Sequence, residues 1–264
     1  MTLQTILNRL QKLHPKEIDL SLDRVKNLCK KLGNPQKDLK YISVVGTNGK
    51  YSTIQALRAI LKEANIKCNI YTSPHIQRIN ERFIFNDEEI SDPDLSDLLV
   101  KVEEVNNGEE ITYFEILTAA YFFHASKYRE NINIIESGLF HRFDATNIID
   151  KNILSIVTAI GLDHLDWLPK NEQTIEKIIY EKTSALLNSK IVVTCNPNNW
   201  EGDYRTWEAL SCGSLVFVDK MVTPIVNPLK NKKNIIYYDR SKLETLYNKL
   251  KFFLLKENKN LRIN

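Results

Sequence analysis

The chain has 264 residues, 43% hydrophobic and 26% charged, as in globular proteins that bury a substantial core. Its 36 basic and 33 acidic side chains leave a net charge of +3, which is too even a balance to indicate nucleic acid or a membrane surface as a partner. The four cysteines are widely spaced and form no CxxC pair, which argues against a zinc site or a disulfide framework. The sequence shows no signal peptide and no apolar run as long as a membrane span, so we expect a cytoplasmic protein.

The first part of the chain predicts helices followed by a βαβ unit. Residues 1–40 are expected to form a helical element, and residues 41–45 form a short β-rich run that leads into a glycine-containing loop at 46–50. Residues 52–65 have helical periodicity, and residues 67–71 are predicted as the next strand. Strand, loop, helix and strand in this order are typical of a parallel sheet.

Apolar strands continue to alternate with helices along the chain. The expected elements are a helix at 111–128, a strand at 132–135 that ends at Glu136, a strand at 153–160, a helix at 175–187 and a strand at 191–194. This alternation predicts an α/β fold in which helices cover both faces of a mostly parallel sheet, that is, a three-layer α/β/α domain.

The alternation of apolar strands and helices is interrupted after residue 195 by a turn-rich stretch. We expect a main domain at 1–195 and a short α/β extension at 196–264. Leu243, Leu246 and Leu250 are spaced as in an amphipathic helix, and the simplest expectation is that this helix docks on the core of the main domain, because about 70 residues make a marginal second domain.

The loop between the first strand and its helix has the composition of a phosphate site. It comprises Gly46, Thr47, Asn48, Gly49 and Lys50, and the helix that follows carries Ser52. Backbone N–H groups at a helix start suit a polyphosphate, and a lysine there supplies a cation for its oxygens. The strand, loop and helix context favours phosphate binding over an ordinary turn.

Polar residues follow the later strands at the edge where an open α/β sheet places its ligands. Glu136 ends one strand, Asp163 and His164 end the next, and a Thr72 to His75 turn follows a third. Considered alone, each residue has a structural alternative to metal binding. His164 could be a structural histidine whose hydrogen bonds are made within the protein, and Glu136 could cap a helix. Together they predict a magnesium site of oxygen ligands with one imidazole.

Several motifs then resemble one family in its own order across about residues 14–190. They are Ile18 to Val25, Val44 to Lys50, Tyr71 to His75, Arg78 to Arg82, Thr112 to Glu115, Glu136 to Leu139, Arg142 to Asn147, Gly161 to His164, and Glu181-Lys182. Together they resemble the folylpolyglutamate/dihydrofolate synthase branch of the Mur-ligase superfamily.

This resemblance implies a reaction and its partners. ATP would phosphorylate a carboxylate of dihydropteroate or folate, and glutamate would attack the acyl phosphate to give an amide, ADP and phosphate. By the same resemblance Mg²⁺ would be bound by Ser73, Glu136 and His164, with Ser52 as a second choice. Lys182 matches a lysine that becomes carbamylated, and the resemblance makes Lys182, His164 and Glu136 the catalytic residues.

The resemblance also implies a set of substrate-binding residues on the pterin side. They are Asp19, Pro74, His75, Thr112, Tyr113, Phe114, Glu115, Phe143, Asp144 and Ala145.

Three departures from the family pattern affect these expectations. Tyr51 stands where the branch has glycine, and we expect helical φ and a steric rather than a conformational effect. Phe140 and His141 replace a glycine pair, so we expect them to obstruct a ligand, and we interpret His141 as a loop histidine near solvent. The family's second α/β domain, with its HNP-type motif, is not visible, and residues 196–264 are not expected to replace it.

These departures leave two alternatives to an active ligase that works alone or with a separate chain supplying the second domain. One is a non-catalytic nucleotide- or pterin-binding remnant of such a synthase. The other is a generic P-loop ATPase or kinase, which accounts for the loop but for none of the later motifs.

Overall fold

The computed structural model describes residues 2–14, 21–149, 152–162, 164–174, 177–182, 191–194, 210, 214–219, 230–233, 235–239 and 241–254. The chain divides into two compact units, Met1–Asn152 with Val157–Lys182, and Ile153–Ile156 with Thr183–Asn264. The division falls after Lys182, whereas the sequence predicted a boundary at residue 195.

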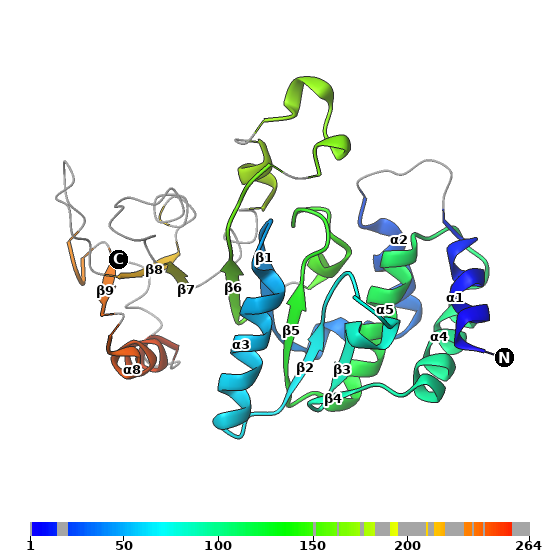
Figure 1. The fold of residues 1–264 in the computed structure, drawn as a ribbon, viewed down its shortest axis with the longest axis horizontal. Helices are drawn as coiled ribbons and strands as arrows, with labels where there is room; N and C mark the ends of the chain where they lie inside the picture. Colours follow the sequence, from blue (N-terminus) through cyan, green and yellow to red (C-terminus); the bar gives the residue numbers. More distant parts are fainter. Residues whose placement is uncertain are drawn as a thin grey trace. The chain divides into compact units, whose positions relative to one another are not determined.

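The main sheet has six strands in the order β4-β3-β2-β5-β1-β6 (Figure 1). The strands are β1 (Lys40–Val45), β2 (Cys68–Tyr71), β3 (Phe83–Phe85), β4 (Glu88–Glu89), β5 (Ile132–Glu136) and β6 (Leu154–Val157). β1 and β2 are both parallel to β5, and β3 and β4 continue the sheet in antiparallel pairs. The mostly parallel α/β fold is therefore confirmed.

Helices cover both faces of this sheet. They are α1 (Leu3–Gln11), α2 (Asp23–Lys31), α3 (Lys50–Glu63), α4 (Asp92–Asn106) and α5 (Tyr113–Ala125). Tyr41 and Ile135 point into one core cluster with α1, α2, α4 and α5, which lie together in Figure 1. Since successive strand residues face opposite sides, Ile42 and Ile134 face the other side, and α3 contacts β1, β2 and β5.

Short 3₁₀ segments connect these elements. They are η1 (Pro35–Asp38), η2 (Ile79–Arg82), η3 (Ser126–Tyr128), η4 (Ala145–Ile148), η5 (Leu165–Trp167) and η6 (Lys170–Glu172). Residues 177–182 are helical, and the rest of the helix predicted to reach residue 187 lies outside the described residues. None of the helices within the described ranges has the length and apolar character needed to cross a membrane.

The parallel strands decide where the site lies. β1 pairs with β5 in the register Val44↔Glu136, and β2 pairs with β5 in the register Tyr71↔Ile135. The carboxyl ends of these three strands therefore meet at one edge of the sheet, and the segments that follow them begin side by side.

The second unit contains a three-stranded parallel sheet in the order β7-β8-β9, formed by β7 (Ile191–Thr194), β8 (Leu215–Asp219) and β9 (Ile236–Tyr238). The strand predicted at 191–194 exists, but it belongs to this sheet and not to the main one. The helix predicted from Leu243 is α8 (Leu243–Leu254), and its expected docking on the main core is wrong. Leu246, Leu250 and Phe253 pack instead on Ile191, Phe217 and Ile236, because these strands offer an apolar face of their own.

Candidate functional site

The predicted phosphate loop connects β1 to the first turn of α3. Gly46 has φ +153°, and a Cβ there would lie 1.9 Å from the Thr158 hydroxyl, so only glycine fits. Gly49 is the N-cap of α3 and no side chain caps that helix. Uncapped N–H groups at the start of a helix of this length form a ready site for an anion.

Hydrogen bonds tie the loop to the segment after β6. The Thr47 amide donates to the Ala159 carbonyl at 2.8 Å. The Thr47 hydroxyl donates to the Gly161 carbonyl at 3.1 Å and accepts from the Gly161 amide at 3.0 Å. Thr47 therefore fixes the shape of the loop, and the donors that face a ligand come from the first turn of α3, where Ser52 is exposed.

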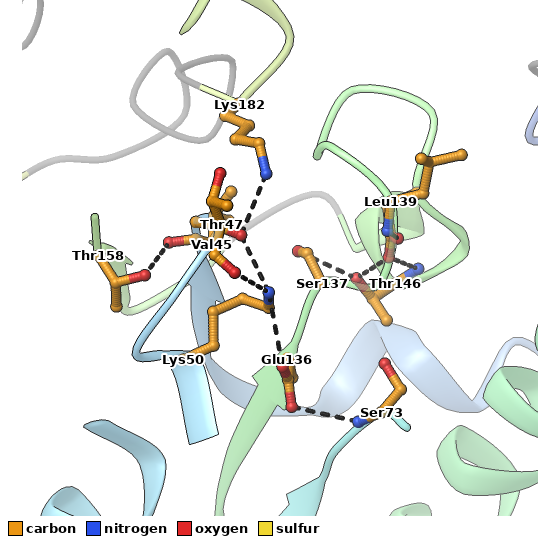
Figure 2. Close-up of polar contacts among 12 residues, drawn as sticks. Val45, Thr47, Lys50, Ser73, Glu136, Ser137, Leu139, Thr146, Thr158 and Lys182 are labelled. Carbon is orange, nitrogen blue, oxygen red and sulfur yellow. Dashed lines mark hydrogen bonds and ion pairs between the residues drawn. The ribbon is translucent and has the colours of Figure 1, made fainter. Parts of the chain in front are cut away.

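The Lys50 side chain folds back over the loop. Its ammonium group donates to the Gly46 carbonyl at 3.0 Å and to the Thr47 carbonyl at 3.2 Å. The same Nζ lies 3.7 Å from Glu136 Oε1 (Figure 2). The predicted phosphate loop and the predicted metal ligand Glu136 are therefore neighbours.

Lys182 approaches the same loop from the opposite side (Figure 2). Its ammonium group donates to the Gly46 carbonyl at 3.1 Å, and the residue is 1% exposed. Lys182 is therefore a buried residue and not a surface lysine of its helix. Its neighbour Glu181 is also buried and holds Arg142 through two hydrogen bonds of 2.7 and 2.8 Å.

Ser73 and Glu136 are brought together as predicted. The Ser73 amide donates to Glu136 Oε2 at 3.1 Å. Burial raises the pKa of the Glu136 carboxyl, and the Ser73 amide and Lys50 oppose this shift only in part. A buried carboxylate with a raised pKa is stabilised by any further cation that binds to it.

A pocket of about 340 Å³ joins these groups. It is lined by Thr47, Asn48, Gly49, Lys50, Tyr51, Thr72, Ser73, Pro74, Ile76, Glu81 and Glu136. The loop, the turn after β2 and the end of β5 thus form one cavity, as the sheet register requires.

Tyr51 lies in the first turn of α3 with helical backbone, as expected. Its side chain is 52% exposed and forms part of the wall of the pocket. The backbone at Tyr51 is therefore unstrained, and the ring is available to contact a ligand in the pocket.

Two of the predicted pterin-side residues have a structural task. The Thr112 hydroxyl accepts from the Glu115 amide at 3.2 Å, and the Glu115 carboxylate accepts from the Thr112 amide at 2.9 Å. This reciprocal pair is the capping box of α5. Glu115 also binds Arg24 of α2 at 3.0 Å, which joins the two helices.

Phe114 and Tyr113 are neighbours in the sequence, but Phe114 packs on another ring whereas Tyr113 lines a pocket. The Phe114 ring stacks on Tyr71 with centroids 6.0 Å apart, and a Cβ at Gly138 would lie 2.9 Å from a carbon of that ring. Tyr113 lines a separate pocket of about 380 Å³ together with His75. His75 accepts from Arg82 Nε at 3.0 Å, and burial and this cation lower its pKa. Pro74 is exposed.

Asp144 is buried within its own loop. One carboxylate oxygen accepts from the Leu139 amide at 2.6 Å and the other from the Thr146 amide at 3.0 Å. Burial raises its pKa, and these amide bonds oppose the shift. Asp144 therefore anchors the loop between Gly138 and Thr146. Ala145 is buried too, while the Phe143 ring lies against the Arg142 guanidinium at 4.3 Å.

The residues that replace the family's glycine pair are both buried. Phe140 has φ +52°, the left-handed region that favours glycine, and it packs on Leu168 and Ile178. His141 is 2% exposed, so its interpretation as a histidine near solvent is wrong. Both side chains turn into the protein, so the expected obstruction of a ligand does not follow from them. Burial lowers the pKa of His141 to about 4.

His164 is exposed and its ring meets Phe140 edge to face at 6.0 Å. Asp163 and Asp19 lie outside the described residues. In the part of the chain that the structure describes, no three His, Cys, Asp or Glu side chains form a metal-binding group.

The sequence of the chain is similar to those of known proteins. The chain is 37% identical over 194 residues to the dihydrofolate synthase/folylpolyglutamate synthase of Haemophilus influenzae, a match covering 73% of this chain and 43% of that protein. The match to the Escherichia coli protein of the same name is 34% over 191 residues, with 72% and 44% covered. The chain is a homologue of the dihydrofolate synthase/folylpolyglutamate synthase family. No family model matches it.

Solved structures support the same relationship. E. coli FolC in complex with DHPP and ADP gives a TM-score of 0.71 at 32% identity, over 83% of this synthase homologue and 51% of that chain. The Yersinia pestis enzyme complexed with AMPPNP and Mn gives 0.70 at 31%, over 83% and 52%. This homologue thus spans less than half the length of those two curated relatives, and about half of the solved chains.

Sequence reasoning did not predict which residues support the loops, although Gly161 and Glu81 lie within the motifs that resemble the family. Thr158, Ala159 and Gly161 hold the phosphate loop through contacts more than a hundred positions away along the chain. Glu81 accepts from the Ile76, Gln77 and Arg78 amides at 2.7 to 2.9 Å, which shapes the turn after β2. The local signal for this role of Glu81 was its position as an acidic residue three positions after the start of the turn.

Proposed function

We propose that this chain carries the nucleotide- and acyl-binding part of an ATP-dependent folate ligase, which joins L-glutamate to a pteroate or folate carboxylate through an acyl phosphate. The observation that carries the proposal is the 340 Å³ pocket, in which the Lys50 loop meets Ser73 and Glu136. Related chains of this fold have been solved with ADP and DHPP, and with Mn, AMPPNP and L-glutamate.

The phosphates of ATP would lie over the start of α3. The uncapped N–H groups of its first turn and the Lys50 ammonium supply donors and positive charge there. Lys50 already lies against the loop carbonyls of Gly46 and Thr47, so little reorganisation is needed before it meets a phosphate oxygen.

Ser73 and Glu136 fit a magnesium ion. Mg²⁺ is bound by a few carboxylate or hydroxyl oxygens together with phosphate oxygens, and the buried Glu136 carboxylate beside Ser73 offers such a set. When bound, the ion would neutralise charge that develops on the transferring phosphoryl group. His164 remains a proposed third ligand from the segment that follows β6.

The residues would act by positioning the two reactants. A carboxylate oxygen of the acyl substrate attacks the γ-phosphorus, the bond to the bridging oxygen breaks, and ADP leaves. The glutamate amine then forms the C–N bond, phosphate leaves with the C–O electron pair, and the amine loses a proton to solvent or a base. The developing negative charge in the first step lies within reach of Lys50 and the α3 N-terminus.

We further propose that Lys182 is carbamylated, as the resemblance implies. Carbon dioxide adds to a neutral amine, and a buried position disfavours the charged ammonium form. The product places an anion beside Gly46 that can bind a cation or orient one of its ligands. Intact mass measurement with and without bicarbonate, on wild type and on Lys182→Met, tests this step.

The test of the proposed function separates a ligase from a remnant. Purified protein is mixed with MgATP, glutamate and either dihydropteroate or tetrahydrofolate, and ADP release and conjugate formation are measured. Conjugate formation that needs all three substrates supports the ligase. Saturable ATP binding without conjugate contradicts catalysis by this chain and supports a non-catalytic nucleotide-binding protein. Failure to bind ATP overturns both readings.

A further inference from the structure

The nucleotide pocket has two chemically different sides. Asn48, Lys50, Ser73 and Glu136 form a polar side, at which phosphates and a metal ion would bind. Tyr51, Pro74 and Ile76 form an apolar rim on the same cavity. The Tyr51 side chain is 52% exposed and that of Ile76 is 82% exposed, so both present apolar surface to whatever enters.

This apolar rim is held in place. Ile76 lies in a turn whose amides at Ile76, Gln77 and Arg78 all bind the Glu81 carboxylate. These bonds lower the pKa of Glu81, so the carboxylate is ionised at neutral pH and keeps its role as acceptor. The turn is closed further by the Thr72 amide, which donates to the Arg82 carbonyl at 3.2 Å. An exposed isoleucine on a turn fixed in this way is a preformed surface.

Tyr51 belongs to an equally fixed element. It is the second residue of α3, and its neighbour Lys50 is bound to the loop carbonyls. The aromatic ring lines the same pocket as Lys50, at which the phosphates are proposed to bind. Its place on the rim follows from the helix and not from a mobile loop.

The chemistry of acyl activation restricts what can touch this rim. For phosphoryl transfer the attacking carboxylate oxygen must lie about 3 to 3.5 Å from the γ-phosphorus. The group bonded to that carboxylate then lies within the same pocket. In a pteroate the carboxylate is attached directly to a benzene ring, whereas in a folate it ends a flexible aliphatic glutamyl chain.

We propose that the rim formed by Tyr51, Pro74 and Ile76 binds the benzoyl ring of a pteroate, and that Tyr51 makes the chain selective for an aryl carboxylate over a glutamyl carboxylate. A flat ring next to the carboxylate can lie against the Tyr51 side chain, and aromatic pairs of this kind add to the stability that burial alone provides. A flexible aliphatic chain can pack on the same apolar groups, but it gains no aromatic pairing with Tyr51 and loses more conformational freedom when it is ordered. This inference rests on the proposed function and specifies its substrate as the acid that receives the first glutamate.

The test measures the binding of both acids to the full chain. Dissociation constants for dihydropteroate and tetrahydrofolate are determined by calorimetry in the presence of Mg²⁺ and a non-hydrolysable ATP analogue. The variants are Tyr51→Ala and Tyr51→Phe, and Tyr247→Ala is the matched control, because Tyr247 is an exposed tyrosine on α8. The ratio of the two constants is the readout, so that any effect on the nucleotide cancels.

We expect wild type to prefer dihydropteroate. Tyr51→Ala should weaken dihydropteroate binding about tenfold and change tetrahydrofolate binding by less than about twofold, while Tyr51→Phe should keep the preference. Equal effects on both acids, no effect on either, or tighter binding of dihydropteroate to Tyr51→Ala would overturn the inference. If wild type binds the ATP analogue but neither acid, the inference is also overturned, whereas the proposed nucleotide site is still supported. Absence of analogue binding to wild type would overturn the proposed function as well.

Discussion

Lys50 and Lys182 donate to the same acceptor, the carbonyl oxygen of Gly46, at 3.0 and 3.1 Å. The two ammonium groups come from the start of α3 and from the helix at 177–182, so the fold brings together two segments that are far apart in the sequence. Both are largely buried, and Glu136 lies 3.7 Å from one of them. The Lys50 cation beside the amides at the start of α3 favours a polyanion.

Lys50→Ala should therefore weaken nucleotide binding. Charged hydrogen bonds contribute about 1.5 to 3 kcal/mol each, so we expect the dissociation constant of an ATP analogue to rise about tenfold to a hundredfold. Calorimetric titration measures it. Lys62→Ala is the control, since Lys62 is an exposed lysine near the far end of the same helix. Equal affinities in both variants would show that Lys50 does not contact the phosphates.

Glu136→Gln should have opposite effects on stability and on metal-dependent binding. Burial raises the pKa of Glu136, so the folded state favours the protonated form. Its stabilising contribution is present below the ordinary pKa of 4.5 and is lost as the pH rises through the raised value in the folded state. The neutral variant should thus gain stability at pH 7 relative to wild type, with a smaller gain at pH 4.

The same variant should bind a nucleotide at least about tenfold more weakly in the presence of Mn²⁺, because it removes an anionic ligand. Thermal unfolding at the two pH values and calorimetry with Mn²⁺ measure the two effects. Glu88→Gln, at an exposed edge-strand position, is the control. Lower stability at pH 7 or unchanged metal dependence in Glu136→Gln would contradict the assignment.

His141 should make the protein sensitive to acid. Burial lowers the pKa of His141 from its ordinary value of 6.5 to about 4. Between these two pH values the imidazole is mostly protonated in the unfolded chain and mostly neutral in the folded protein. The free energy of unfolding should fall from about pH 6.5 to about pH 4, where the loss is complete. His124, whose pKa burial also lowers to about 4, adds to this fall.

Urea unfolding at a series of pH values measures this effect. His141→Gln should flatten the fall, and the further change His124→Gln should flatten it more. His14→Gln, at an exposed position, should leave the slope as in wild type. A slope unchanged in His141→Gln would mean that the buried imidazole takes up its proton in the folded state.

Asp144→Ala should destabilise the protein by roughly 2 to 4 kcal/mol, because it leaves buried amide donors without an acceptor. The donors lost are the amides of Leu139 and Thr146. Urea unfolding measures the change, and Asp97→Ala, at an exposed position of α4, should cost less than about 0.5 kcal/mol. A cost as small as that for Asp144→Ala would mean that this carboxylate does not anchor the loop.

The main sheet and its site edge could be predicted from the sequence for a simple reason. β1, β2 and β5 are short apolar runs with a polar residue or glycine at the end, and parallel pairing then places Lys50, Ser73 and Glu136 at one edge. The order of the strands and the alternation of apolar strands with helices are enough to place these three residues together.

The second sheet was not predicted because no local pattern tells which sheet a strand joins. The run at 191–194 is apolar in either setting, and its partners in β8 and β9 come from later segments. Likewise the amphipathic pattern from Leu243 predicts a helix but not the surface that it covers.

The surroundings of single residues were the hardest to predict. A loop histidine is exposed in most proteins, yet His141 is buried, and its neighbour Phe140 adopts a conformation that its side chain disfavours. Thr112 and Glu115 carry a capping-box spacing that also predicts their observed roles.

A crystal structure of the chain with Mg²⁺ and a non-hydrolysable ATP analogue tests the central claim most directly. The account predicts the triphosphate over the first turn of α3, with the Lys50 ammonium on a phosphate oxygen and the ion beside Ser73 and Glu136. A nucleotide bound elsewhere, or phosphates beyond the reach of Lys50 and Glu136, would contradict it.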